Sequence, residues 1–182
     1  QQIQNNLKGI DMVIGAKGSP LQLILSSIYQ IDNPTGNISY EEAKRVTNNS
    51  LVDFTIPLSY GDSYNGFRIV GTKKKYLQLY DCKIDKGNIW EKSMEAVIGS
   101  KVALINNLKI GDKFYGTHGF SNDGHVHDEH YYKVVGILKK SNSTVDNLIL
   151  TNLKSVWDIH SDHEHHEHHE HHEHHEHHEH HE

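Results

Sequence analysis

The chain has one cysteine and no long apolar run, and these absences exclude several classes of protein. The single cysteine, Cys82, can form no disulfide within the chain and no paired-thiolate zinc site. No stretch reaches the roughly 18 apolar residues that a membrane-spanning helix needs. The beginning, QQIQNNLKGI, lacks the basic and apolar regions of a signal peptide. We therefore expect either a soluble cytoplasmic protein or an excised soluble domain, and the start without an initiator Met favours the domain.

Basic residues are also scarce, with 18 Lys and Arg against 24 Asp and Glu, for a formal net charge of −6. Residues 161–182 hold seven Glu and one Asp and no Lys or Arg, so their formal charge is −8. Subtracting this from −6 leaves a formal charge of +2 for residues 1–160. The nearly neutral body has no Lys/Arg stripe of the kind that binds nucleic-acid phosphates. We therefore predict no nucleic-acid partner.

Histidine is the residue that the chain has in excess. The last 22 residues, SDHEHHEHHEHHEHHEHHEHHE, hold 13 of the 18 histidines. Imidazole and carboxylate are ligands for zinc and neighbouring metals, so this tail predicts metal binding. A purification tag is the alternative, but the HHE repeat is unlike the usual six consecutive histidines, and we favour a native tail.

The first part of the body predicts a strand and two helices. Met12 to Ile14 form a short apolar run, and Ser19 and Pro20 then open a helix that reaches about Tyr29 with apolar residues at helical spacing. Ser39 and Glu42 form a capping box that predicts a second helix.

From Leu51 onward, short β-branched and aromatic runs alternate with turns. We predict a turn at Asp85 to Asn88, a helix at Lys101 to Leu108, a strand opening at Asp112, an alternating strand over HYYKVVGIL, and a strand and short helix in DNLILTNLKSVWDIH. Strands and helices without a regular βαβ rhythm indicate the α+β class. We expect one domain at 1–160 and a low-complexity tail at 161–182.

A second histidine cluster lies inside the body, in THGFSNDGHVHDEHYYKVVG. Three imidazoles with nearby carboxylates could supply most of a tetrahedral zinc shell, and His118 could complete it from upstream. The alternative is a solvated polar loop. The predicted metal ligands are His118, His125, His127 and His130 in this cluster, with His160, His163, His165 and His166 at and after the end of the body.

The same loop comes close to an enzyme motif. His125, His127, Glu129 and His130 resemble the H-x-H-x-D-H signature of metallo-β-lactamase-like hydrolases, with Glu in place of Asp. Only about 30 residues follow before the tail, with His160 as the one further histidine, so a metallo-hydrolase is a remote alternative. We expect no enzyme and assign no catalytic residue.

Several segments together resemble a known family. IDMVIGAKGSPLQLILSSIYQIDNPTGNI, IPLSYGDSYNGFRIVGT, EAVIGSKVA, LKIGDKFYGTHG, YYKVVGIL and TNLKSVWDIH are similar, in this order, to the extracytoplasmic domain of MacB/FtsX-type ABC transporter permeases, and most to a zinc-linked branch. The resemblance implies a MacB-like α+β periplasmic domain with a porter-like β-α-β portion and a smaller inserted subdomain at roughly 55–120.

The resemblance also implies a function. It predicts a periplasmic domain of an inner-membrane permease that transmits ATPase-driven conformational change and binds or senses Zn²⁺ or a similar divalent metal. Its implied partners are its own transmembrane helices, a cytoplasmic ABC ATPase subunit, possible periplasmic metal-binding or adaptor proteins, and a second permease copy in a dimer. The competing hypothesis is a self-standing periplasmic zinc-buffering protein in which the tail is the functional part.

Overall fold

A computed structural model describes residues 9–118 and 126–159, without the side chains of residues 118 and 126–130. Helices and a single sheet are interspersed along it, so the fold is α+β, as predicted. The helices are α2 (Pro20–Ile24), the π-helix η1 (Leu25–Tyr29), α3 (Tyr40–Thr47), α4 (Lys75–Leu79), α5 (Ser100–Asn106), the 3₁₀-helix η2 (Thr144–Asn147) and residues 153–159. The strands are β1 (Ser59–Tyr64), β2 (Phe67–Thr72), β3 (Ile84–Gly87), β4 (Glu95–Ile98), β5 (Lys113–His118), β6 (Val126–Leu138) and β7 (Leu148–Asn152).

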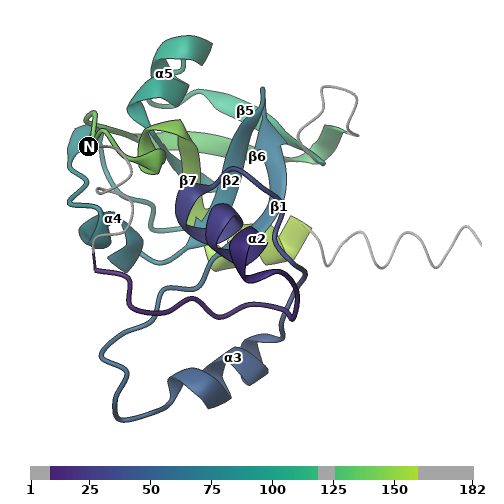
Figure 1. Ribbon diagram of the computed structural model, residues 1–182. Helices are drawn as coiled ribbons and strands as arrows, with labels where there is room; N and C mark the ends of the chain where they lie inside the picture. The colour runs from purple at the N-terminus through teal and green to yellow at the C-terminus, as the bar shows by residue number, and fades with distance from the viewer. Residues whose placement is uncertain (1–8, 119–125, 160–182) are drawn as a thin grey trace, which may run out of the picture.

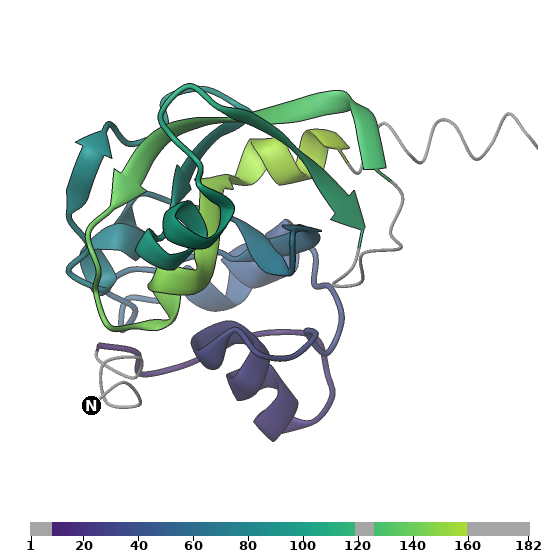
Figure 2. The ribbon, with the colours of Figure 1, turned by 90° about the horizontal axis from the view of Figure 1, so that it is seen from above.

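The seven strands form one sheet that closes on itself. Their order is β3-β6-β4-β7-β2-β1-β5, and a further pairing joins β5 to β6. The 13-residue strand β6 makes this closure because its first part pairs with β5 and its last part with β4 and β3. Figure 2 shows β6 curving along one side of the molecule. The predicted inserted subdomain at about 55–120 supplies five strands of this sheet, and its boundaries stay a prediction.

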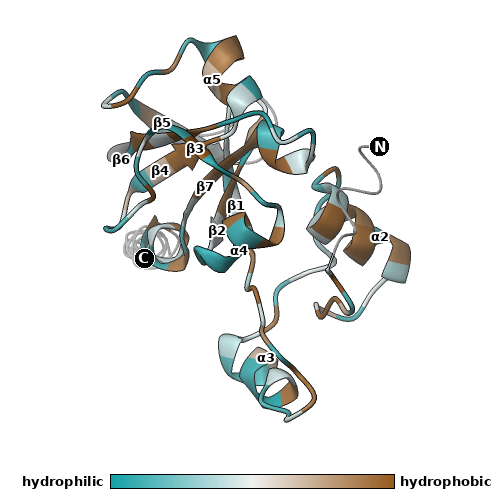
Figure 3. Cartoon of the chain, turned by 90° about the vertical axis from the view of Figure 1, so that its left-hand side faces the viewer, coloured by the Kyte–Doolittle hydropathy of each residue, from teal (hydrophilic) through white to brown (hydrophobic). Residues whose placement is uncertain are grey.

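The central strands are buried on both faces, which follows from their apolar sequences. In β7 the side chains of Leu148 and Leu150 join one core cluster and Ile149 joins the other, as a two-residue repeat requires. The second cluster draws on β2, β4, β5, β6 and β7 and on Ile159 of the last helix. The closed sheet is therefore filled by side chains, and Figure 3 shows apolar residues in strands such as β4 and β7 as well as on α2 and α5.

Two local predictions are wrong. Met12 to Ile14 are not in a strand, and Met12 is 64% exposed, so the segment has neither a strand partner nor an apolar surface to cover it. The predicted turn at Asp85 to Asn88 overlaps β3, which pairs with the end of β6. The partner of β3 lies about fifty residues further along the chain, and local turn signals carry no information about it.

The helix starts are as predicted. The Ser19 side chain accepts a hydrogen bond from the backbone of Gln22, and Pro20 occupies the first turn of α2. Ser39 and Glu42 form the predicted capping box of α3. In Figure 1 α3 lies below the sheet, and it buries no residue of its own. Its Tyr40 ring contacts Trp157 at 5.6 Å between centroids, which joins α3 to the C-terminal helix.

Arg68 attaches the N-terminal helices to the sheet. Its side chain is 4% exposed, and it donates hydrogen bonds to the backbone oxygens of Ser26 (3.3 Å) and Asp32 (2.6 Å). The guanidinium lies 4.9 Å from the centroid of the Tyr60 ring, and Gln30 bonds both Tyr60 and Arg68. We call Gln30, Tyr60 and Arg68 the anchor. Figure 1 shows α2 in front of the sheet.

We predict that Arg68→Met loosens the N-terminal helices without opening the sheet. Methionine keeps much of the apolar volume but removes charged hydrogen bonds of about 1.5–3 kcal/mol each. Hydrogen exchange of residues 20–32 should therefore accelerate at least tenfold, while exchange in β7 stays unchanged. Leu104→Met, at a position that is 80% exposed, is the control. Equal acceleration in β7 and α2 would contradict a local role for Arg68.

Candidate functional site

The predicted histidine ligands fall into two groups by position. His118 ends β5, and His127 and His130 lie in β6, so the antiparallel β5–β6 pair brings these three chain positions into one region. His125, His160, His163, His165 and His166 lie outside the described residues. In Figures 1 and 2, β5 ends and β6 begins on the same side of the molecule on which residues 153–159 end.

The β5–β6 pairing is irregular at the histidines. Tyr115 pairs with Tyr131, but Thr117, two residues further along β5, pairs with Val126. The four residues 127–130 therefore lie opposite the single residue Gly116. This large bulge places two histidine positions at the point where the regular ladder is interrupted, as bulges near functional sites often do.

The structure adds a carboxylate that the sequence did not reveal. Asp62 of β1 pairs directly with His118 of β5, and its side chain is only 5% exposed. A side chain built at Gly116 would meet Asp62 Oδ2 at 2.9 Å, so the carboxylate lies against the glycine backbone opposite the bulge. The sequence YGDSYNG reads as a turn region, and no local signal marks Asp62 as a buried strand residue.

Tyr132 is the second polar group in this region. Its side chain is fully buried, and its hydroxyl has no hydrogen-bond partner among the described residues. Burial, and then the charge of Asp62, raise the pKa of the Tyr132 phenol well above its usual range. The hydroxyl is therefore protonated and able to donate a hydrogen bond.

Burial raises the pKa of Asp62 from 3.8 to about 6. The folded state therefore binds a proton at Asp62 more readily than the unfolded state does. The stability that the neutral carboxyl contributes is fully present below about pH 3.8 and is lost as the pH rises through about 6. At neutral pH the ionised Asp62 carboxylate is buried, and its charge lowers the free energy of unfolding.

We predict that Asp62→Asn removes this loss of stability at neutral pH in metal-free protein. Two pKa units correspond to about 3 kcal/mol, so the stability of the variant relative to wild type should increase by up to about 3 kcal/mol between pH 4 and pH 7. Urea unfolding in the presence of a chelator measures it. Titration of the tail affects both proteins equally and cancels in the difference. Parallel pH profiles for the two proteins would contradict a raised pKa at Asp62.

Other places in the described structure offer less chemistry. No three His, Cys, Asp or Glu side chains gather closely enough to hold a metal ion among the side chains that the structure describes. An open hollow of about 560 Å³ is lined by residues that include Lys74, Glu91 and Glu95. The Glu95 carboxylate already accepts hydrogen bonds from the backbone of Glu91 and Lys92, at 2.7 and 3.0 Å, which lower its pKa.

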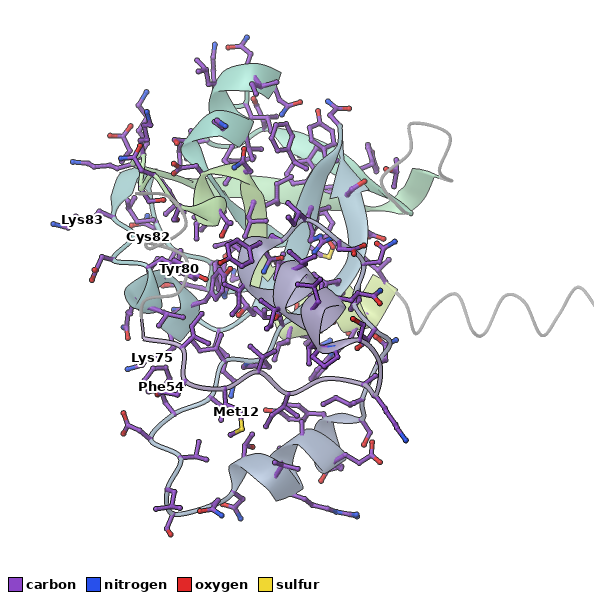
Figure 4. All side chains as sticks on the ribbon, in the orientation of Figure 1. Met12, Phe54, Lys75, Tyr80, Cys82 and Lys83 are labelled. Atoms are coloured by element: carbon purple, nitrogen blue, oxygen red, sulfur yellow. The ribbon has the colours of Figure 1, made fainter. Side chains whose placement is uncertain are left out.

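The surroundings of Cys82 disfavour the thiolate form of its side chain. Figure 4 shows it beside Tyr80, whose backbone oxygen accepts a weak hydrogen bond from its sulfur at 3.8 Å. Burial, followed by the charges of Asp146 and Asp81, raises the pKa of the Cys82 thiol to about 12. The thiolate that a nucleophile or a metal ligand requires is therefore rare at neutral pH.

Comparison with known proteins gives structural neighbours only. No family model and no curated protein matches the chain. The periplasmic region of MacB from Actinobacillus actinomycetemcomitans is similar at 15% identity and a TM-score of 0.49, over 87% of this chain and 73% of that one. The extracellular domain of the noncanonic ABC-type transporter YknZ from Gram-positive bacteria is similar at 11% identity and a TM-score of 0.49, over 81% of this chain and 75% of that one. In the described ranges no helix has the length and apolar character to cross a bilayer.

Proposed function

We propose that the chain is the extracytoplasmic domain of an ABC transporter permease, which transmits ATPase-driven movement and binds a divalent metal through its histidines. The proposal rests first on the six segments whose order resembles MacB/FtsX-type permeases. The α+β fold agrees with it. The domain itself performs no chemistry in this proposal, and an ATPase subunit supplies the energy.

The observation that carries the mechanical part is the anchor. Arg68 belongs to the family-like segment that contains FRIVGT, and the backbone oxygens that it binds, those of Ser26 and Asp32, belong to the earlier family-like segment. A buried, charged contact between these two segments resists separation, because breaking it would leave a charge without partners. Movement applied to the N-terminal helices would therefore pass to the sheet.

The metal part rests on the two histidine groups. Positions 118, 127 and 130 share one strand pair, and residues 153–159, which precede the tail in the sequence, end on the same side of the domain. A metal that binds one conformation more tightly than another would bias the movement of the domain. Zinc is the first choice because imidazole and carboxylate suit it, although nickel, cobalt and copper use the same ligands.

In this proposal both ends of the domain must reach the same membrane surface. In Figures 1 and 2 the described chain begins and ends on different sides of the sheet. Flanking segments would have to bring both ends to one membrane surface.

We predict that this domain is exposed outside the cytoplasmic membrane in intact cells. Leu104 lies on α5 with 80% of its surface exposed. The one cysteine of the wild type, Cys82, is half-buried, and the pKa of its thiol is raised to about 12, which keeps it in the unreactive thiol form. A membrane-impermeant maleimide should therefore label the native gene product carrying Leu104→Cys in whole cells, and should leave wild type unlabelled. The labelled protein should remain in the membrane pellet after carbonate extraction. Labelling only after lysis would contradict the location, and release into the soluble fraction would favour a self-standing buffering protein.

We predict that the body binds metal without the tail. In a full-length chain in which serine replaces the 13 histidines after His160, Zn²⁺ should still bind with a Kd at or below about 10 μM at pH 7.5, a range open to a site with three protein ligands. Affinity should fall at least tenfold at pH 5.5 because imidazoles become protonated. Calorimetry measures both values, and no binding at micromolar zinc would exclude the loop site.

A further inference from the structure

The outward face of the β5–β6 pair carries two lysines and two tyrosines. Lys113 pairs with Lys133, and Tyr115 pairs with Tyr131, across the antiparallel ladder. All four side chains are exposed, with Tyr115 at 42% and Tyr131 at 41%. They alternate with buried residues along both strands, as a two-residue repeat requires. We call these four residues the Lys/Tyr face.

The contacts within the Lys/Tyr face suit a ligand that is both anionic and able to pack on aromatic rings. The Lys113 ammonium lies 4.0 Å from the centroid of the Tyr131 ring, and the rings of Tyr115 and Tyr131 meet edge to face at 6.5 Å between centroids. Like charges directly opposite each other on paired strands destabilise a sheet. An anion bound between Lys113 and Lys133 would therefore stabilise it.

The carboxylates next to these lysines already bind backbone groups. Glu95, which pairs with Lys133, accepts two backbone N–H groups at 2.7 and 3.0 Å, and Asp112, the residue before β5, accepts one at 2.8 Å. The two backbone bonds, and then the charges of Lys92 and Lys133, lower the pKa of Glu95. Three lysines, with Lys113 the third, thus accompany two carboxylates that already have backbone partners.

The acidic tail is the segment of this chain whose chemistry fits the Lys/Tyr face. Residues 161–182 carry a formal charge of −8 without a Lys or Arg, and their repeat offers carboxylates to lysines and imidazoles to tyrosine rings. The tail also starts nearby, because Ile159 belongs to the same core cluster as Phe114 and Tyr132, which lie on the inner side of these strands. Its 22 residues can span up to about 70 Å, enough to pass around the edge of the sheet.

We propose that residues 161–182 bind the Lys/Tyr face of their own chain, with Glu carboxylates on the two lysines and imidazoles on the two tyrosine rings. A single exposed ion pair contributes about 1 kcal/mol or less. A tethered segment, however, has an effective concentration in the millimolar range, so several weak contacts suffice to hold it. Because the contacts are exposed, salt should weaken them.

A second step of the inference rests on the metal binding proposed above. Each Zn²⁺ that the tail binds adds two positive charges, so about four ions would cancel its formal charge of −8. Imidazoles that coordinate zinc are also no longer available to the tyrosine rings. Metal binding should therefore release the tail and uncover the Lys/Tyr face, which couples the metal to the surface that the domain presents.

Paramagnetic broadening in the full-length chain tests the docking. A nitroxide is attached to Glu173→Cys in the tail, with Cys82→Ala so that one thiol remains. At about pH 7.5, where imidazoles are neutral, and at low salt, the amide signals of Tyr115 and Tyr131 should lose at least half of their intensity. About 0.5 M NaCl should restore them.

Two double variants of this labelled chain locate the contact. Lys113→Gln with Lys133→Gln should restore both tyrosine signals. Lys139→Gln with Lys140→Gln is the matched control, because these lysines are also exposed and their replacement removes the same charge just beyond the end of β6. The control should keep the broadening. Equal broadening in the two double variants would overturn docking at the Lys/Tyr face.

Zinc distinguishes this inference from the proposed function. Zn²⁺ added until calorimetry shows the tail to be saturated should restore the tyrosine signals of the labelled parent. Broadening that persists with zinc bound would overturn the release by metal. Absence of broadening without zinc would overturn the docking and leave the proposed metal function standing. A tail that docks but binds no zinc would overturn the second step and the metal role of the tail, while the docking stands.

Discussion

The pairing of β6 with strands on both of its sides is the constraint on which the rest of the structure depends. Its first half pairs with β5 and its second half with β4, so this one strand closes the sheet. Closure encloses the core cluster around Ile149 and gives six of the seven described strands a partner on both sides, while β3 pairs with β6 alone. It also brings Asp62, Tyr132 and the histidine positions 118, 127 and 130 into one region of the sheet. The pairing of β6 therefore determines both the core and the arrangement of the candidate site.

Much of the local structure could be predicted from the sequence, because short-range chemistry determines it. Ser19 with Pro20 and Ser39 with Glu42 begin helices through bonds to backbone groups three residues away. The strand at Met12 to Ile14 and the turn at Asp85 to Asn88 were wrong, because strand formation depends on a partner elsewhere in the chain. The closure of the sheet could not be predicted for the same reason.

Some residues of the candidate site could be predicted from the sequence, and others could not. Histidine density is a compositional signal, and it is the basis on which positions 118, 127 and 130 are predicted to bind metal. Asp62 and Tyr132 come from strands that are brought together only by the register of β1, β5 and β6, so nothing near them in sequence marks them. Burial raises the pKa of Asp62. This shift depends on the strand pairing, so it could not be predicted from the sequence.

The position of β7 has a consequence for how the domain is made. This strand is near the end of the body, yet it lies between β2 and β4 and hydrogen-bonds to both, in parallel to the first and antiparallel to the second. The centre of the sheet has a gap until residue 152 is available. Pairing over such separations in the chain folds slowly. A chain that emerges from its N-terminus during synthesis or export would hold β2 and β4 with unsatisfied edges until nearly all of the body had emerged, and it would need protection from aggregation during that interval.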